Sequence, residues 1–409
     1  MAGRSSCGRS PSSTSEHMNV EQVFREERGR LLATLVKRFG DLDLAEEVTS
    51  DAIEAALKHW PVDGVPDRPG AWLLTTARRK AVDRLRRDQV YAARLALLQV
   101  EVDRADPRTG DGLPDERLEL FFTCAHPALA EEDRGALTLR CLAGFTTPEV
   151  ARAYLVPVTT MQQRIVRAKK KIKEARIPFR VPDPHELPER LPGVLQAVYS
   201  IFTEGYAAQR GELAGEAIRL ARILQGLLPD REVTGLLALM LLIHARRDAR
   251  AELLEDQDRA LWDRDMINEG SALAERALTG GHGPYGVQAA INALHDEAPD
   301  FDSTDWPQIV ALYDVLTKLT PSPVVALNRA AAIAMRDGAE TGLALLDALA
   351  GVPRLRDYHP YRAARADLLH RLGRDAEAAQ AYREAIALAG TESEQDFLRR
   401  RLTAIEGRP

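Results

Sequence analysis

The sequence has little of what disulfide-bonded or membrane proteins require. Its three cysteines, Cys7, Cys124 and Cys141, show neither metal-ligand nor disulfide-framework spacing, which favours reduced thiols in a cytosolic protein. The longest apolar run, Leu236 to Ile243, is far shorter than the roughly 18 residues of a membrane helix. The first 17 residues are Ser-rich and polar, without a signal-peptide core, and we expect them to be disordered. We therefore expect a cytoplasmic protein without membrane contact.

Recognisable catalytic motifs are also missing. We find no Walker loop and no GxSxG, HExxH or CxxC motif. One acidic cluster lacks the loop glycine and the final glutamate of a calcium-binding EF-hand, so we interpret it as a solvated helix face. It contains Glu255, Asp256, Asp258, Asp263 and Asp265. We predict that the protein is not an enzyme and needs no metal or cofactor.

The charge is unevenly distributed. The net charge of −6 alone argues against a nucleic-acid partner, but residues 185–409 hold 25 Lys and Arg residues against 34 Asp and Glu residues. Residues 159–180 hold eight basic residues against Glu174 alone. Such a local patch, rather than the global charge, is what a nucleic acid would meet.

A helix-turn-helix is predicted over residues 145–173. Thr147 can cap a first helix that has Pro148 at its first position. Pro157 interrupts the pattern because it removes a backbone donor and restricts the preceding residue. The segment therefore indicates two short helices joined by a tight turn.

The second of these helices, starting at Thr159 or Thr160, has one apolar and several basic or polar sides. Met161, Ile165, Ala168 and Ile172 form an apolar stripe. Gln and Arg near its start can read base edges, and Lys further along can neutralise phosphates. A solvated amphipathic helix is the alternative for this stretch alone. The DNA-contact candidates are Thr159, Thr160, Gln162, Gln163, Arg164, Arg167, Lys170 and Lys171, and Lys169 and Lys173 share the charged faces.

Two helices are predicted at the start of the chain. The first spans residues 20–39 and ends at Gly40; the second begins at Asp43, with Glu46 completing a capping box. Along the second helix an acidic stripe, Glu47, Asp51 and Glu54, lies apart from the apolar residues. Solvation alone also explains such a stripe.

A third, basic helix is predicted over residues 70–88, after a Pro-rich loop at 61–69. Its polar sides could follow a phosphate backbone, and Trp60 and Trp72 beside the loop could stack unpaired bases. Trp72 equally fits a core position. The basic candidates are Arg78, Arg79, Lys80, Arg84, Arg86 and Arg87.

The rest of the chain reads as helices, and those before the repeats are predicted roughly over residues 193–205, 213–228, 232–250, 256–278, 285–297 and 306–319. Aligning Gly338 with Gly373 gives a period of 35, close to that of tetratricopeptide repeats. The predicted organisation is a disordered segment (1–17), a first helical domain (18–92), a linker (93–112), a helix-turn-helix domain (113–177), a Pro-rich linker (178–192) and a helical domain (193–409) with repeats near 323–390. We predict an all-α fold.

Three stretches in this order resemble the extracytoplasmic-function sigma factors of bacterial RNA polymerase. DLDLAEEVTSDAIEAALKHW (41–60) is similar to region 2.2 of that family, PGAWLLTTARRKAVDRLRR (69–87) to regions 2.3–2.4, and residues 137–173 to region 4. LPERLPGVLQAVYSIFTEGYAA (187–208), LLEDQDRALWDR (253–264) and PSPVVALNRAAAIAM (321–335) resemble the long extension of one subgroup. The family commonly has Ile and Asn where Thr76 and Arg79 stand, and a small or basic pair in place of Gln162-Gln163, so promoter specificity does not carry over.

The resemblance implies a sigma factor that binds core RNA polymerase, through the β′ clamp helices and the β flap, and promoter DNA. The acidic stripe would meet the clamp helices, the basic helix the −10 element and the helix-turn-helix the −35 element. Residues 193–409 would contact a regulatory protein or the chain itself. Two alternatives stay open: a stand-alone helix-turn-helix regulator with a sensing domain, and a helical-repeat scaffold with an incidental basic helix.

Overall fold

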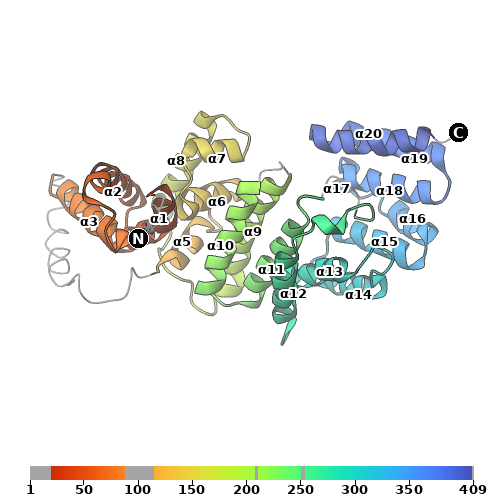
Figure 1. Ribbon diagram of the computed structural model, residues 1–409, viewed down its shortest axis with the longest axis horizontal. Helices are drawn as coiled ribbons and strands as arrows, with labels where there is room; N and C mark the ends of the chain where they lie inside the picture. Colours follow the sequence, from red (N-terminus) through yellow and green to blue (C-terminus); the bar gives the residue numbers. More distant parts are fainter. Residues whose placement is uncertain (1–19, 88–114, 208–210, 250–253, 408–409) are drawn as a thin grey trace, which may run out of the picture. The chain divides into compact units, whose positions relative to one another are not determined.

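The computed structural model describes residues 20–87, 115–207, 211–249 and 254–407. These residues form helices joined by short turns and contain no β-strand, so the predicted all-α fold is confirmed (Figure 1). The predicted disordered segment 1–17 and linker 93–112 lie outside them. The chain divides into two compact units, residues 1–197 and 198–409. No helix among the described residues is both long and apolar enough to cross a membrane.

The first three helices of unit 1 are α1 (Val20–Phe39), α2 (Leu42–Asp63) and α3 (Pro69–Arg87). Helix α1 has the predicted bounds and ends at Gly40, whose φ of +70° suits a residue without Cβ. Helix α2 differs from the prediction at both ends. Its N-cap is Asp41 and not Asp43, because the Asp41 carboxylate accepts a hydrogen bond from the Leu44 amide at 3.0 Å. The helix also runs through Pro61, which was assigned to the following loop.

An aromatic cluster joins these three helices. Trp60 on α2 is buried, with its ring centroid 5.3 Å from that of Phe24 on α1 and 5.5 Å from that of Trp72 on α3. Such tilted or edge-on ring pairs add to the free energy of burial. Trp72, which is only partly exposed, therefore belongs to this packing.

The second half of unit 1 contains α5 (Arg117–Cys124), α6 (Glu131–Thr138), the π-helical turn η2 (Leu139–Ala143), α7 (Thr147–Ala153) and α8 (Val158–Glu174). Helix α1 packs on α5 and η2, which joins the two halves. Cys124 and Cys141 are free and buried. Helix α9 (Leu187–Ala207) begins six residues before the predicted start at residue 193. Its first part belongs to unit 1, where Arg190 donates a hydrogen bond to the Phe122 carbonyl oxygen at 3.1 Å.

Unit 2 is built around α11 (Arg231–Ala245), the segment with the longest apolar run. Nearly all its side chains are buried because α10 (Gly211–Leu227), α12 (Arg264–Leu278) and α13 (Pro284–Glu297) pack against it. Helix α14 (Trp306–Leu319) follows with the predicted bounds. The apolar run is thus the centre of a helical core.

Two helix pairs with glycine turns follow, as the 35-residue period predicts. Helices α15 (Pro323–Asp337) and α16 (Ala339–Ala348) meet at Gly338, φ +100°, and α18 (His359–Arg371) and α19 (Asp375–Leu388) meet at Gly373, φ +71°. The short α17 (Pro353–Arg356) lies between the pairs and α20 (Glu392–Glu406) follows them. One apolar cluster runs through both pairs and α20.

Candidate nucleic-acid and polymerase interface

The helix-turn-helix forms where the sequence predicts it, with a different cap. The Thr146 hydroxyl accepts a hydrogen bond from the Glu149 backbone amide at 3.4 Å, and the Glu149 carboxylate accepts one from the Thr146 backbone amide at 2.6 Å. The predicted cap Thr147 is already helical, so the capping box begins one residue earlier. In the turn Leu155 has a φ of +51°, and Pro157 caps α8, which starts at Val158 rather than at Thr159 or Thr160.

Helix α8 uses one side for packing and presents the other. Met161, Ile165 and Ala168 are buried, and α8 packs on α6 and α7. Because the apolar stripe faces inward, the polar positions between its members face outward. Six DNA-contact candidates are exposed: Thr159, Gln162, Gln163, Arg167, Lys170 and Lys171. The other two, Thr160 and Arg164, are partly exposed.

Most of these candidates surround one hollow on the first half of α8. Arg164 is oriented there by an ion pair with Glu132 of α6, Nη2 to Oε2 at 3.4 Å. The hollow thus combines amide, hydroxyl and guanidinium groups, which can donate and accept hydrogen bonds at base edges. It is lined by Thr159, Thr160, Gln162, Gln163, Arg164, Val166 and Arg167, with Glu132.

Two lysines of the same helix face α2 instead. Lys169 forms ion pairs with Glu46 and, at 3.0 Å, with Asp43; Lys173 lies 3.7 Å from Asp41. Burial would lower the pKa of Lys169, but its contacts with Glu46 and Asp43 outweigh burial and raise that pKa. Lys169 and Lys173 are therefore engaged within the protein.

Glu46 is the residue whose role sequence reasoning missed. It was assigned to a capping box, yet its side chain is 7% exposed and lies between Lys169 and Arg140, whose Nε is 3.1 Å away. Arg140 belongs to η2 and lies more than 90 residues after Glu46 in the sequence. A glutamate on the inward side of an amphipathic helix was the available signal, because buried carboxylates require cationic partners.

The six basic candidates of α3 differ in their surroundings. Arg79 and Arg86 are exposed, Lys80 and Arg78 are partly exposed, and Arg87 is the last residue of the helix. Burial, and secondarily the charge of Arg38, lowers the pKa of Arg78. Arg84 reaches α2, where it binds Glu47 and Asp51, the latter at 3.1 Å.

The acidic stripe of α2 is thus already paired. Arg84 joins two stripe residues, and the third, Glu54, receives a hydrogen bond at 2.6 Å from Lys58, which lowers the pKa of Glu54. The structure brings together residues that the sequence assigned to different partners. Exposed ion pairs of this kind contribute little to stability, so a stronger partner can replace them.

The acidic cluster near residue 260 is not the solvated helix face that the sequence indicated. Asp258 and Asp263 cap η3 (Arg259–Leu261) and α12, while Glu255 and Asp256 pair with arginines of α18 and α20. Helix α12 begins at Arg264, so the predicted helix from Asp256 is wrong in its first part. Within the four described ranges no three His, Cys, Asp or Glu residues gather as a metal site.

Comparisons with known proteins assign these helices. Sigma-70 region 2 matches residues 23–90, which include most of α1 and all of α2 and α3. Sigma-70 region 4 matches residues 122–172, which include most of the helix-turn-helix. The chain belongs to the extracytoplasmic-function sigma factor family, in a form with a C-terminal extension. A family of unknown function (DUF6596) matches residues 190–278 of that extension.

Two relatives illustrate the extent of this likeness. An uncharacterized protein of Rhizobium meliloti is 42% identical over 410 residues, which cover 95% of this chain and 96% of the relative. A protein of Mycobacterium tuberculosis called "Probable ECF RNA polymerase sigma factor SigI" is 26% identical over 170 residues, 40% of this sigma factor and 57% of that protein. No solved structure matches the chain.

Proposed function

We propose that this sigma factor binds core RNA polymerase and directs transcription initiation at promoters, with α8 in the major groove of the −35 element. The exposed hollow on the first half of α8 carries this proposal. Gln162, Gln163 and Arg167 project from a helix whose other side is packed, so their side chains can reach bases while the helix is held. Lys170 and Lys171 continue along the helix toward phosphates.

The basic side of α3 is proposed to hold the −10 element. Arg79 and Arg86 are exposed, and phosphate neutralisation needs accessible cations. Arg84 reaches DNA only when it leaves Glu47 and Asp51. We therefore place Arg78, which is half-buried, and Arg84 behind the phosphate contacts rather than among them.

The acidic stripe Glu47, Asp51 and Glu54 is the proposed docking surface for a basic surface of core polymerase. A basic partner that contacts the stripe replaces Arg84, which is then released beside the DNA-binding side of α3. Core binding and DNA binding are coupled in this arrangement. Replacing Arg84 costs little free energy because both of its ion pairs are partly solvent-exposed.

Binding of the full chain to core polymerase, followed by run-off transcription, tests the proposal. Asp51→Arg should weaken core binding severalfold because it places a cation opposite the basic partner. Asp357→Arg, a change of equal charge at an exposed position of unit 2, is the control. Absence of core binding by the wild type, with tight binding of duplex DNA alone, would identify a stand-alone helix-turn-helix regulator instead.

The extension, residues 193–409, is proposed to contact a regulatory protein or to regulate the sigma regions. Its helical pairs bury a continuous core and leave side chains of successive helices on a shared surface. A truncation that tests its role must retain α9, because the first part of that helix belongs to unit 1 and contacts α5 there through Arg190. Removing residues from 185 onward would disturb the sigma regions themselves.

A further inference from the structure

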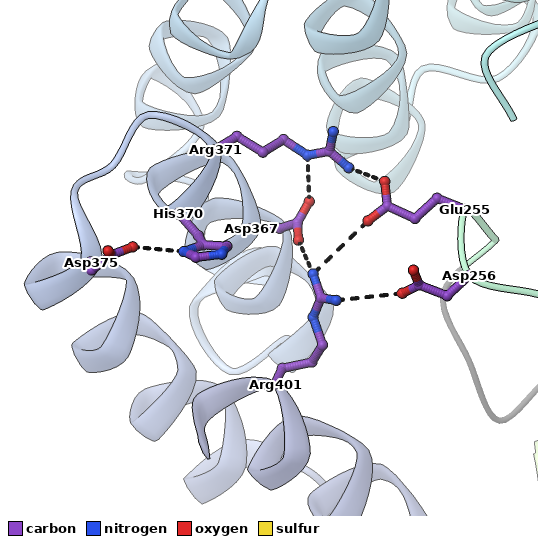
Figure 2. A network of polar contacts seen from close by, with 7 residues as sticks. All are labelled: Glu255, Asp256, Asp367, His370, Arg371, Asp375 and Arg401. Atoms are coloured by element: carbon purple, nitrogen blue, oxygen red, sulfur yellow. Dashed lines mark hydrogen bonds and ion pairs between the residues drawn. The ribbon is translucent and has the colours of Figure 1, made fainter. Parts of the chain in front are cut away.

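Two arginines of unit 2 are held side by side by one carboxylate. Asp367 of α18 accepts from Arg371 Nε at 3.1 Å and from Arg401 Nη2 of α20 at 2.8 Å (Figure 2). Each guanidinium retains a further N–H edge that points away from Asp367. We call Arg371 and Arg401 the arginine pair.

The outer edges of the arginine pair bind a segment from between α11 and α12. Arg371 Nη2 contacts the Glu255 carboxylate, and Arg401 Nη1 lies 3.5 Å from Asp256 Oδ2 (Figure 2). These acidic residues stand more than 100 positions before the arginines. A short acidic segment is thus bound as a peptide ligand would be.

An apolar cavity adjoins the charged contacts. Its volume is about 260 Å³, and Leu254, the residue before the acidic pair, lines it with Phe301, Trp306, Tyr313 and Met335. Glu255 and Arg371 line the same cavity. Leu254 therefore lies against apolar side chains while the next two residues contact the arginine pair, so the surface combines apolar and cationic contacts for one short segment.

The arginine pair has contacts outside the segment. Asp367 contacts both guanidinium groups, and Tyr382 and Asp367 raise the pKa of Arg401 against the effect of burial. The pKa of Arg371 is raised against burial by Asp367 together with Glu255. Without Glu255 and Asp256, Asp367 remains as the carboxylate that contacts both arginines, and Arg401 keeps its contact with neutral Tyr382, so one positive charge stays uncompensated. The vacated surface would be preorganised and cationic.

We infer that this surface binds an acidic segment of another protein, an apolar residue followed by two carboxylates, and that Leu254–Asp256 occupies it as an internal ligand. A partner binds at this site by displacing the chain's own segment, Leu254–Asp256. Binding requires neither DNA nor core polymerase, so it can fail or succeed independently of the proposed sigma activity. The segment's occupancy reduces the apparent affinity of any competitor in proportion to the fraction of time that the site is free.

The test uses the full chain and a fluorescent peptide of residues 254–260, LEDQDRA, followed by anisotropy. Glu255→Gln with Asp256→Asn should empty the arginine pair and raise affinity for the peptide at least about tenfold over the wild type. Adding Arg371→Gln and Arg401→Gln should abolish that gain. The matched control adds Arg336→Gln and Arg383→Gln, two ion-paired arginines elsewhere in unit 2.

Binding should weaken as salt rises, and the peptide LQNQDRA, which lacks the two carboxylates, should not compete. Equal affinity of the wild type and the emptied variant would overturn the inference, because the segment would then be a fixed structural element. Persistent binding after loss of both arginines would also overturn it. If the glutamine variants unfold, Arg371→Lys with Arg401→Lys keeps the charge, and loss of the paired geometry should still weaken binding several-fold.

Discussion

Gly29→Ala tests whether sigma regions 2 and 4 pack together in the free protein. Gly29 lies on α1 in region 2, and a Cβ there would stand 2.8 Å from the carbonyl oxygen of Leu142 in region 4. A backbone atom cannot rotate away as a flexible side chain can, so α1 and η2 would have to separate. The substitution therefore acts on the contact between the regions and not on α1 itself.

The two contributions have opposite signs. Alanine in place of glycine within a helix stabilises by about 1 kcal/mol, and overpacking a close contact costs about 1–3 kcal/mol. We expect Gly29→Ala to lower the free energy of unfolding of unit 1 by up to about 2 kcal/mol. Gly215→Ala on α10 is the matched control, because a Cβ there meets nothing within 4 Å and only the helix-propensity gain remains.

Thermal unfolding, with hydrogen exchange in α1 and η2, measures the effect. A loss of about 1 kcal/mol corresponds to roughly 2–4 °C for a unit of this size. Gly29→Ala should lower the unfolding temperature and the protection of α1 and η2 from hydrogen exchange, while Gly215→Ala should raise the unfolding temperature. If Gly29→Ala stabilises the protein as Gly215→Ala does, regions 2 and 4 do not pack in solution as they do here.

Three further predictions concern other sites. Burial raises the pKa of Asp296 to about 7 despite nearby Arg246, so the free energy of unfolding should fall as the pH rises from about 4 to 7. Burial lowers the pKa of His295 to about 4, so this residue makes the free energy of unfolding rise between about pH 4 and 6.5 and opposes the effect of Asp296 there. Urea unfolding of Asp296→Asn across pH 4–8 should show only the loss of stability toward acid. Thr146→Ala should lower the free energy of unfolding by about 1 kcal/mol and raise the rate of hydrogen exchange in α7. No change in either quantity would show that the capping box does not form in solution. In transcription from a −35 library, Gln163→Ala should change sequence preference and Lys170→Ala should weaken all promoters alike; equal losses would refute base contact by Gln163.

The sequence predicted elements whose causes are local. Helix α1 follows from its apolar spacing and the stop at Gly40, and α14 from the run that begins at Trp306. The polar side of α8 was likewise predictable, because the apolar stripe Met161, Ile165 and Ala168 fixes which side faces outward. Periodicity and capping sufficed at these positions.

The errors occur where distant residues decide. Asp41 and Asp43 are both acceptable caps by composition, and Glu46 satisfies the spacing of a capping box from Asp43. Its burial depends on Lys169 and Arg140, which no local pattern connects to α2. The segment at Glu255 was misread as helix for the same reason, since its partners belong to α18 and α20.

The contact between α2 and α8 bears on how the proposed promoter binding can occur. Elements named −35 and −10 lie roughly 25 base pairs apart, about 85 Å along B-DNA at 3.4 Å per pair. A compact unit of 197 residues has a radius of gyration of only about 16 Å. Helices α3 and α8 therefore cannot reach both elements while Lys169 remains paired with Glu46. Promoter binding requires these regions to separate, which exposes Glu46 and frees Lys169 and Lys173 for phosphates. In the proposed promoter complex, the lysines that pair with α2 in the free protein would contact phosphates, so the same cations would serve both states.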